Sequence, residues 1–189
     1  MDPVNAEQTV VAACAECVET TLPAIPGAQP LESLIRRYRA ADGRVRVDLE
    51  RISIITNPMT QERILLDHIA MEARILMEEV AIPQEPALPQ IPGIPAVPGI
   101  PNAPNVVQLG KDFIDGLEVE GLRYVFAALD PLELPTITSW EIWTSTKLQM
   151  PVLTRTTGAF GVRTCKCTCA AMNPPESMFQ VPTGYRVVR

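Results

Sequence analysis

The sequence predicts a mainly β protein, an antiparallel sheet interrupted by a long polyproline II segment. Short runs rich in Val, Ile, Thr and aromatic residues recur along the chain, separated by Pro, Gly or Thr-Ser turns. The pair Asp42-Gly43 has the sequence of a tight hairpin turn. From Pro83 to Pro104 a proline occupies every third position. We therefore expect an N-terminal part of the β domain, a polyproline II rod and a C-terminal part of the β domain, at residues 1–80, 81–107 and 108–189.

Composition limits the class of protein. A chain of 189 residues with 47% hydrophobic residues is long enough for one domain with a core. The formal net charge of −6 leaves no basic face for a phosphate backbone, so we expect no nucleic-acid partner. No apolar run reaches the roughly 20 residues of a membrane span. The first residues also lack the pattern of a signal peptide, which predicts either a cytosolic protein or a mature exported form.

The first expected elements lie before the Asp-Gly pair. Residues 8–22 are rich in Val, Thr and Ala and predict a strand, which a proline-containing break at 23–30 ends. On either side of Asp42-Gly43 the chain has β character. We expect these two stretches to pair as a hairpin.

The second arm of that hairpin predicts a half-buried strand. From Val45 to Leu49 apolar residues alternate with charged ones, so one face is buried and the other faces water. After Arg51 the apolar phase shifts to Ile52 and Ile54. A phase shift of one residue within a strand is what a β-bulge produces, so we expect a bulge here.

Residues 61–79 are ambiguous. Their Leu, Met, Ala, Glu and Arg favour a helix by intrinsic propensity, whereas the alternation around residues 69–75 is typical of a strand. Both interpretations stay open from composition alone. In the second half, four β-like runs predict strands, namely GLEVEGLRYVF (116–126), ITSWEIWTS (137–145), QMPVLTRTTG (149–158) and GVRTCKCTCA (161–170).

The proline column predicts a rod with two apolar edges. Polyproline II has three residues per turn, so a period of three aligns all the prolines along one edge. The residues that precede the prolines are mostly Ile, Leu and Val and form a second edge. We expect the following residues to make subunit contacts: Ile82, Pro83, Pro86, Leu88, Pro89, Ile91, Pro92, Ile94, Pro95, Val97, Pro98, Ile100, Pro101 and Pro104.

Length favours an intersubunit arm over the alternative of a stiff, disordered spacer. At about 3.1 Å per residue the rod spans about 65 to 70 Å, whereas a compact domain of this size is about 40 to 45 Å across. Another chain must therefore cover part of the apolar edge unless the rod folds back. A ligand for an SH3 domain is a weaker interpretation, because no basic residue lies between Glu78 and Gly110.

Five cysteines form one group near each end of the chain. The first group is Cys14 and Cys17, and the second is Cys165, Cys167 and Cys169. In a strand the second group points to one face, whereas two cysteines three residues apart fall on opposite faces. A disulfide between the two groups is favoured over buried thiols and over a metal site, because CKCTC is not the usual zinc-ligand spacing.

The chain lacks the usual motifs of catalysis. Its single histidine, His68, lies among apolar residues and is expected to be structural. Glu118 and Glu120 have the spacing of a solvated strand face, while Trp140 and Trp143 are more typical of a core than of a pocket. No phosphate-binding loop, GxSxG, HExxH or GxGxxG motif occurs. We expect no catalytic residues, no metal and no cofactor.

Five stretches, in one order along the chain, are similar to a single protein family. This family comprises uncharacterised secreted bacterial proteins, common in Acidobacteria, whose fold resembles the LolA-like lipoprotein-carrier half-barrel. The stretches cover about half of the chain. They are RYRAADGRVRVDL (37–49), ISIITNPMTQERILLD (52–67), GLEVEGLRYVF (116–126), EIWTSTKLQMPVLTRT (141–156) and NPPESMFQVPTGYRVV (173–188).

This resemblance refines the expected fold and location. It implies a strongly curved antiparallel sheet or half-barrel, and it makes residues 61–79 a strand and tail rather than a helix. It also implies export, which favours disulfides and an extracellular or periplasmic location. The family supplies no catalytic residues and does not require the proline rod or the CKCTC cluster.

Two functions follow from these features. The first is a non-enzymatic extracellular structural or assembly subunit, a filament or multimer in which the proline rod docks on neighbouring copies and disulfides reinforce the sheet. Its expected partner is a second copy of the chain. The alternative is a periplasmic LolA-like carrier that holds lipid or another apolar ligand on a concave sheet face.

Overall fold

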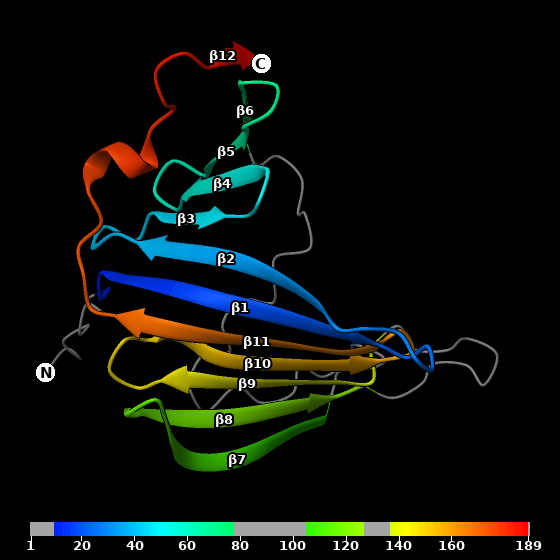
Figure 1. Ribbon diagram of the computed structural model, residues 1–189. Coiled ribbons are helices and arrows are strands. Elements are labelled where there is room, and N and C mark those ends of the chain that lie inside the picture. The colour runs from blue at the N-terminus through cyan, green and yellow to red at the C-terminus, as the bar shows by residue number, and fades with distance from the viewer. Residues whose placement is uncertain (1–9, 78–104, 127–136, 189) are drawn as a thin grey trace, which may run out of the picture. The chain divides into compact units, whose positions relative to one another are not determined.

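A computed structural model describes residues 10–77, 105–126 and 137–188 (Figure 1). These residues form β-strands and one 3-10 helix, which confirms the prediction of a mainly β protein. The elements are β1 (Ala13–Pro23), β2 (Leu31–Arg39), β3 (Val45–Asp48), β4 (Ile52–Asn57), β5 (Glu62–Asp67), β6 (Glu72–Met77), β7 (Asn105–Ile114), β8 (Leu117–Val125), β9 (Ser139–Ser145), β10 (Met150–Gly158), β11 (Gly161–Ala170), η1 (Glu176–Phe179) and β12 (Arg186–Val188).

The predicted proline arm lies outside the described residues. All fourteen of its expected contact residues, from Ile82 to Pro104, fall within the range 78–104. Both the arm and the predicted division of the chain at this segment therefore stay predictions. In the described part of the chain, no helix has the length and apolar character that a membrane span requires.

The strands belong to one hydrogen-bonded sheet in the order β12-β6-β5-β4-β3-β2-β1-β11-β10-β9-β8-β7. Described neighbours pair antiparallel, except that β12 pairs parallel with β6. The chain divides into two compact units. Strands β1, β2 and β11 each contribute residues to both units. The first unit contains Met1–Glu16, Ile35–Met77 and Thr168–Arg189, and the second contains Cys17–Leu34 and Glu78–Cys167.

The Asp-Gly hairpin is present in the first unit. Strands β2 and β3 pair antiparallel, with Arg39 opposite Val45. Gly43 has a φ of +88°, which favours glycine over other residues. The N–H of Gly43 donates to the carbonyl of Ala40 at 3.0 Å and closes the turn. The Asp42 carboxylate accepts a hydrogen bond from the N–H of Arg44, as aspartate does in many turns.

The expected bulge after Arg51 is wrong. Strand β3 ends at Asp48 and β4 begins at Ile52, and the two strands pair antiparallel. The N–H of Leu49 donates to the carbonyl of Ile52 at 2.8 Å, so the chain reverses direction between them. A turn into a new strand shifts the apolar phase of the sequence just as a bulge within one strand does. Only the strand pairing distinguishes a turn from a bulge.

Residues 61–79 contain two strands rather than a helix or a single strand with a tail. Strands β5 and β6 pair antiparallel, with Leu66 opposite Ala73. The carboxylate of Asp67 accepts hydrogen bonds from the N–H groups of Ile69 and Ala70, both at 2.9 Å, and this holds the turn. The strand interpretation is confirmed, and the helix alternative fails because this turn divides the segment.

Apolar side chains of the first unit gather under the 3-10 helix η1. Phe179 from η1 is buried against the strands, with an exposed fraction of 5%. Met178, beside it, packs against the same group. The buried members of this core are Ala40, Ile55, Leu66, Ala73 and Phe179.

The second unit contains an antiparallel meander in which β7, β8, β9, β10 and β11 lie side by side (Figure 1). All four β-like runs predicted in this half are strands. Gly121 of β8 lies opposite Trp143 of β9, and a Cβ on Gly121 would come within 2.7 Å of the indole ring. Glycine is therefore favoured here, because a larger residue would clash with the indole ring.

Candidate functional site

One face of the second unit carries a row of side chains across four strands. Leu122 of β8 lies opposite Ile142 of β9, which lies opposite Thr154 of β10, which lies opposite Cys165 of β11. Directly opposed residues in an antiparallel sheet point to the same side. Ile142 and Cys165 are buried, while Leu122 and Thr154 are half-buried.

An aromatic pair extends this row. Tyr124 lies opposite Trp140, and their rings stack with centroids 5.3 Å apart at 26°. Both side chains keep part of their surface exposed. Burial raises the pKa of the Tyr124 phenol, which is therefore neutral at physiological pH. We call the following group the apolar face: Leu122, Tyr124, Trp140, Ile142, Thr154 and Cys165.

The opposite face of the same strands is ionic. Trp143 directly follows Ile142 in β9. Successive side chains of a strand point to opposite faces, so Trp143 points to this side. Its indole Nε1 donates to Glu141 at 2.8 Å, and Arg123 donates to the same carboxylate at 2.8 Å. Burial alone would raise the pKa of Glu141, but these hydrogen bonds from Trp143 and Arg123 hold it below its ordinary value. The two tryptophans therefore have different surroundings.

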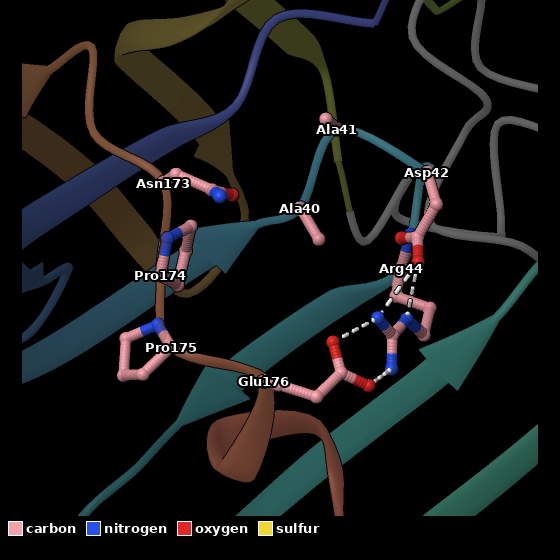
Figure 2. Close-up of a pocket in the computed structure, with 8 residues that line it drawn as sticks. All are labelled: Ala40, Ala41, Asp42, Arg44, Asn173, Pro174, Pro175 and Glu176. Atoms are coloured by element: carbon pink, nitrogen blue, oxygen red, sulfur yellow. Dashed lines mark hydrogen bonds and ion pairs between the residues drawn. The ribbon is translucent and has the colours of Figure 1, made fainter.

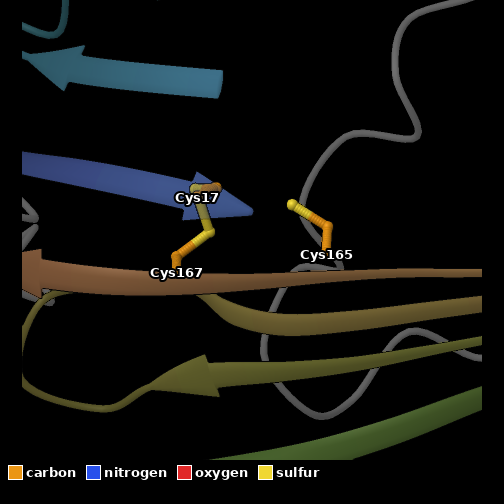
Figure 3. Close-up of side chains that lie close together, drawn as sticks. All are labelled: Cys17, Cys165 and Cys167. Carbon is orange, nitrogen blue, oxygen red and sulfur yellow. A yellow bond between two sulfur atoms is a disulfide. The ribbon is translucent and has the colours of Figure 1, made fainter. Parts of the chain in front are cut away.

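The disulfide predicted between the two cysteine groups is present and links Cys17 of β1 to Cys167 of β11 (Figure 3). Cys165 points to the same side of β11, and the three sulfur atoms all lie within 4.8 Å of one another. Exposed residues Lys166 and Thr168 alternate with the cysteines of β11, as the sequence predicts for a strand.

The two other cysteines, Cys14 and Cys169, are half-buried and belong to the first unit. The Cys14 sulfur lies 4.0 Å from the carbonyl oxygen of Met172. Burial raises the pKa of the Cys14 thiol, so this thiol is a weaker nucleophile than an exposed one at neutral pH.

A shallow pocket of the first unit contains three charged side chains (Figure 2). The guanidinium of Arg44 donates two hydrogen bonds to Glu176, at 2.5 and 2.6 Å, and one to Asp42 at 2.8 Å. It also lies over the Phe179 ring, 5.1 Å from the centroid. Because its donors already meet two carboxylates, Arg44 does not offer a site for an anionic ligand.

His68 takes part in a polar network of the first unit. Its Nε2 lies 2.7 Å from the hydroxyl oxygen of Ser53, and its Nδ1 lies 2.6 Å from the hydroxyl of Tyr185. Ser53 is completely buried and donates its only hydroxyl proton to Asp48 at 2.5 Å. Nε2 of a neutral His68 must therefore carry a proton and donate to Ser53. This arrangement holds the elements together, and in it Asp48, not His68, accepts the Ser53 proton.

The sequence singled out Trp140 and the cysteines but missed the other members of the apolar face. Leu122 and Tyr124 stand on either side of Arg123 in GLEVEGLRYVF, so the strand pattern places them on a common face. The pairing register of the strands decides which residues of β9 and β10 come near Leu122 and Tyr124. No local sequence pattern specifies that register.

No protein-family model and no curated protein sequence matches the chain. Its fold matches a solved structure, an uncharacterized conserved protein from Thermus thermophilus. The TM-score is 0.56 at 12% sequence identity, and the match covers 93% of this chain and 90% of that chain. The two proteins share a fold.

Two further solved structures are similar over most of their length. Lipoprotein LppX from Mycobacterium tuberculosis has a TM-score of 0.39 at 9% identity, covering 82% of this chain and 84% of that chain. A LolA superfamily protein from Nitrosomonas europaea has a TM-score of 0.28 at 12% identity, covering 90% of each chain. Both scores are below 0.5, so the fold comparison depends on the Thermus protein. A LolA superfamily protein is among the similar structures, and the acidobacterial origin stays a prediction.

Proposed function

We propose that the protein is a non-enzymatic, extracytoplasmic carrier that holds a lipid or another apolar ligand on the apolar face of its second unit. The observation that carries this proposal is the continuous row from Leu122 to Cys165 across β8, β9, β10 and β11. The stacked rings of Tyr124 and Trp140 extend the row at one side. Ligand sites are commonly lined in this way, by apolar and aromatic side chains with few polar groups.

The contrast between the two faces supports an apolar ligand. One face carries the group of Arg123, Glu141 and Trp143, whose polar atoms hydrogen-bond to one another. The other carries the apolar face, with the ion pairs of Lys111 with Glu118 and Glu120 further along β7 and β8 on the same side. The part of the apolar face that is exposed to water costs free energy in proportion to its area. An acyl chain laid across the strands would remove from water the apolar surface that Leu122, Tyr124 and Trp140 leave exposed.

The resemblance to the LolA-like lipoprotein-carrier half-barrel supports the same function. A disulfide between Cys17 and Cys167 is typical of proteins outside the reducing cytosol, which favours a periplasmic location. The assembly-subunit interpretation depends on the proline arm, which lies outside the described residues. The carrier is therefore the better-supported of the two functions.

Lipid binding by the purified protein tests this proposal. We expect organic extraction of protein purified from its native compartment to release lipid that mass spectrometry detects. We also expect a fluorescent long-chain fatty acid to bind saturably to delipidated protein. Absence of both lipid and fatty-acid binding from correctly folded protein would refute the carrier function.

A matched pair of variants locates the site. Leu122 and Leu153 are both half-buried, but they point to opposite faces of the sheet. Burying a leucine side chain is worth about 1.5 to 3 kcal/mol, so Leu122→Gln should weaken fatty-acid binding by about tenfold or more. Leu153→Gln should leave the affinity within about twofold of the wild type. Equal losses in the two variants would show that the ligand does not lie on the apolar face.

A further inference from the structure

The disulfide of the second unit has a third sulfur beside it. The exposed fractions of Cys17, Cys165 and Cys167 are 0%, 5% and 4%, and their sulfur atoms form a compact group (Figure 3). We propose that reduction of the Cys17–Cys167 disulfide opens a buried site in which Cys17, Cys165 and Cys167 bind one Cu(I) ion. Cys165 also belongs to the apolar face, but metal binding at this site does not require that the protein carry lipid.

The spacing of the three sulfurs suits a single ion. Three sulfurs placed around one ion at a metal–sulfur distance of about 2.3 Å would lie about 4 Å from one another. The three sulfurs already lie within 4.8 Å of one another. Once the disulfide is reduced, small rotations of the Cys17 and Cys167 side chains would bring the set to this spacing.

The sheet holds the three ligands in place. Cys165 and Cys167 are two residues apart on β11, so their side chains point to the same side. β10 pairs with β11 and fixes Cys165 opposite Thr154. Cys17 comes from β1, the neighbour of β11 on its other side. A site built on paired strands keeps its geometry better than one on loops, because hydrogen bonds restrain the backbone.

The donor set favours a soft, monovalent ion. In the described part of the chain the metal-ligating group consists of these three cysteines, without histidine or carboxylate. Thiolates select Cu(I), Zn²⁺ or iron–sulfur clusters. Structural Zn²⁺ sites are almost always four-coordinate, and a buried set of three sulfurs lacks a fourth ligand. Cu(I) accepts three sulfur ligands, so it fits the group better than zinc.

The chemistry balances in two steps. A dithiol reductant gives two electrons and two protons to the Cys17–Cys167 disulfide, producing two thiols, and is itself oxidised to a disulfide. Cu(I) then binds to the three sulfurs and displaces their thiol protons to solvent, with no change in the oxidation state of copper. Oxidation reverses the first step and removes two of the three ligands, so the disulfide excludes the metal.

Copper titration of a variant without the other two cysteines tests the site. The C14S/C169S protein keeps only the three ligands, so any thiol-bound copper must involve them. After anaerobic reduction with a dithiol and desalting, we expect one Cu(I) per chain by elemental analysis, and less than about a tenth of that for the oxidised protein. Circular dichroism before and after reduction shows whether the sheet is retained. A reduced protein that is folded and free of copper, or one that unfolds and is not restored by Cu(I), would overturn the proposal.

The role of the third sulfur needs a separate measurement, because two thiolates alone also bind Cu(I). We expect X-ray absorption to show three sulfur ligands in the reduced C14S/C169S protein and two after the further change Cys165→Ser. Competition with a Cu(I) chelator should show at least tenfold weaker binding in that variant. Equal affinity and equal sulfur number would overturn the three-sulfur site. Binding of Zn²⁺ in preference to Cu(I) would overturn the assignment of the metal.

Discussion

Nδ1 of His68 lies 2.6 Å from the hydroxyl oxygen of Tyr185, 117 positions away in the sequence, and Tyr185 donates this hydrogen bond when His68 is neutral. The direction follows from the buried partner, because Ser53 gives its proton to Asp48 and must receive one from Nε2 of His68. The two rings also meet edge to face, with centroids 6.0 Å apart. This contact ties the segment before β12 to the turn after β5 in the first unit.

Removing the hydroxyl of Tyr185 should therefore destabilise the protein. Tyr185→Phe leaves Nδ1 of the half-buried His68 without its donor, and such a loss costs about 1 to 2 kcal/mol. The free energy of unfolding from urea denaturation measures the effect. Tyr38→Phe is a matched control, because Tyr38 packs on the same core, and no described hydrogen bond involves its hydroxyl. Equal destabilisation in the two variants would show that the hydrogen bond contributes little.

A side chain at Gly121 should be costly because of Trp143. The added Cβ of Gly121→Ala would lie 2.7 to 2.8 Å from three atoms of the indole ring. The ring must then move and lose its hydrogen bond to Glu141, at a cost of about 1 to 3 kcal/mol. Replacing the ring relieves the clash, so Gly121→Ala should cost much less in a Trp143→Leu background. Urea denaturation of the double-mutant cycle measures this coupling, and additive effects would contradict it.

Acid should weaken the ionic face through Glu141. The pKa of this carboxyl is below its ordinary value of 4.5 in the folded protein, so the unfolded chain binds its proton more readily. The charged carboxylate of Glu141 therefore contributes fully to stability above about pH 4.5. This contribution is lost as the pH falls through the lower pKa that Glu141 has in the folded protein. Glu141→Gln should make the decline in unfolding free energy shallower in this acid range. Parallel curves for the wild type and the variant would contradict the assignment.

Loss of the disulfide should lower stability substantially. Cys17 and Cys167 are 150 residues apart in sequence, and in the chain-entropy account a loop of this length gives about 4 to 5 kcal/mol. We expect the C17S/C167S protein to unfold at a lower urea concentration by a margin of this order. A matched Cys14→Ser variant, which leaves the disulfide intact, should stay close to the wild type. A small difference between the two variants would show that the unfolded chain is already compact.

Local patterns predicted several of the described strands correctly. The runs in the second half, the hairpin at Asp42-Gly43 and the alternation of cysteines along β11 are properties of neighbouring residues. Each depends on backbone preference and on the twofold period of a strand, which short segments carry by themselves. The expectation of a disulfide between the two cysteine groups was also confirmed, because the cysteines fall in only two groups.

The tertiary structure alone decided which residues meet. It divided residues 61–79 into two strands, replaced the expected bulge with a turn, and chose Cys17 and Cys167 from six combinations between the two groups. It also set Leu122 opposite Ile142 and brought Tyr185 to His68. The physical reason is that strand register and side-chain contacts depend on groups distant in sequence, whose positions follow from packing of the whole sheet.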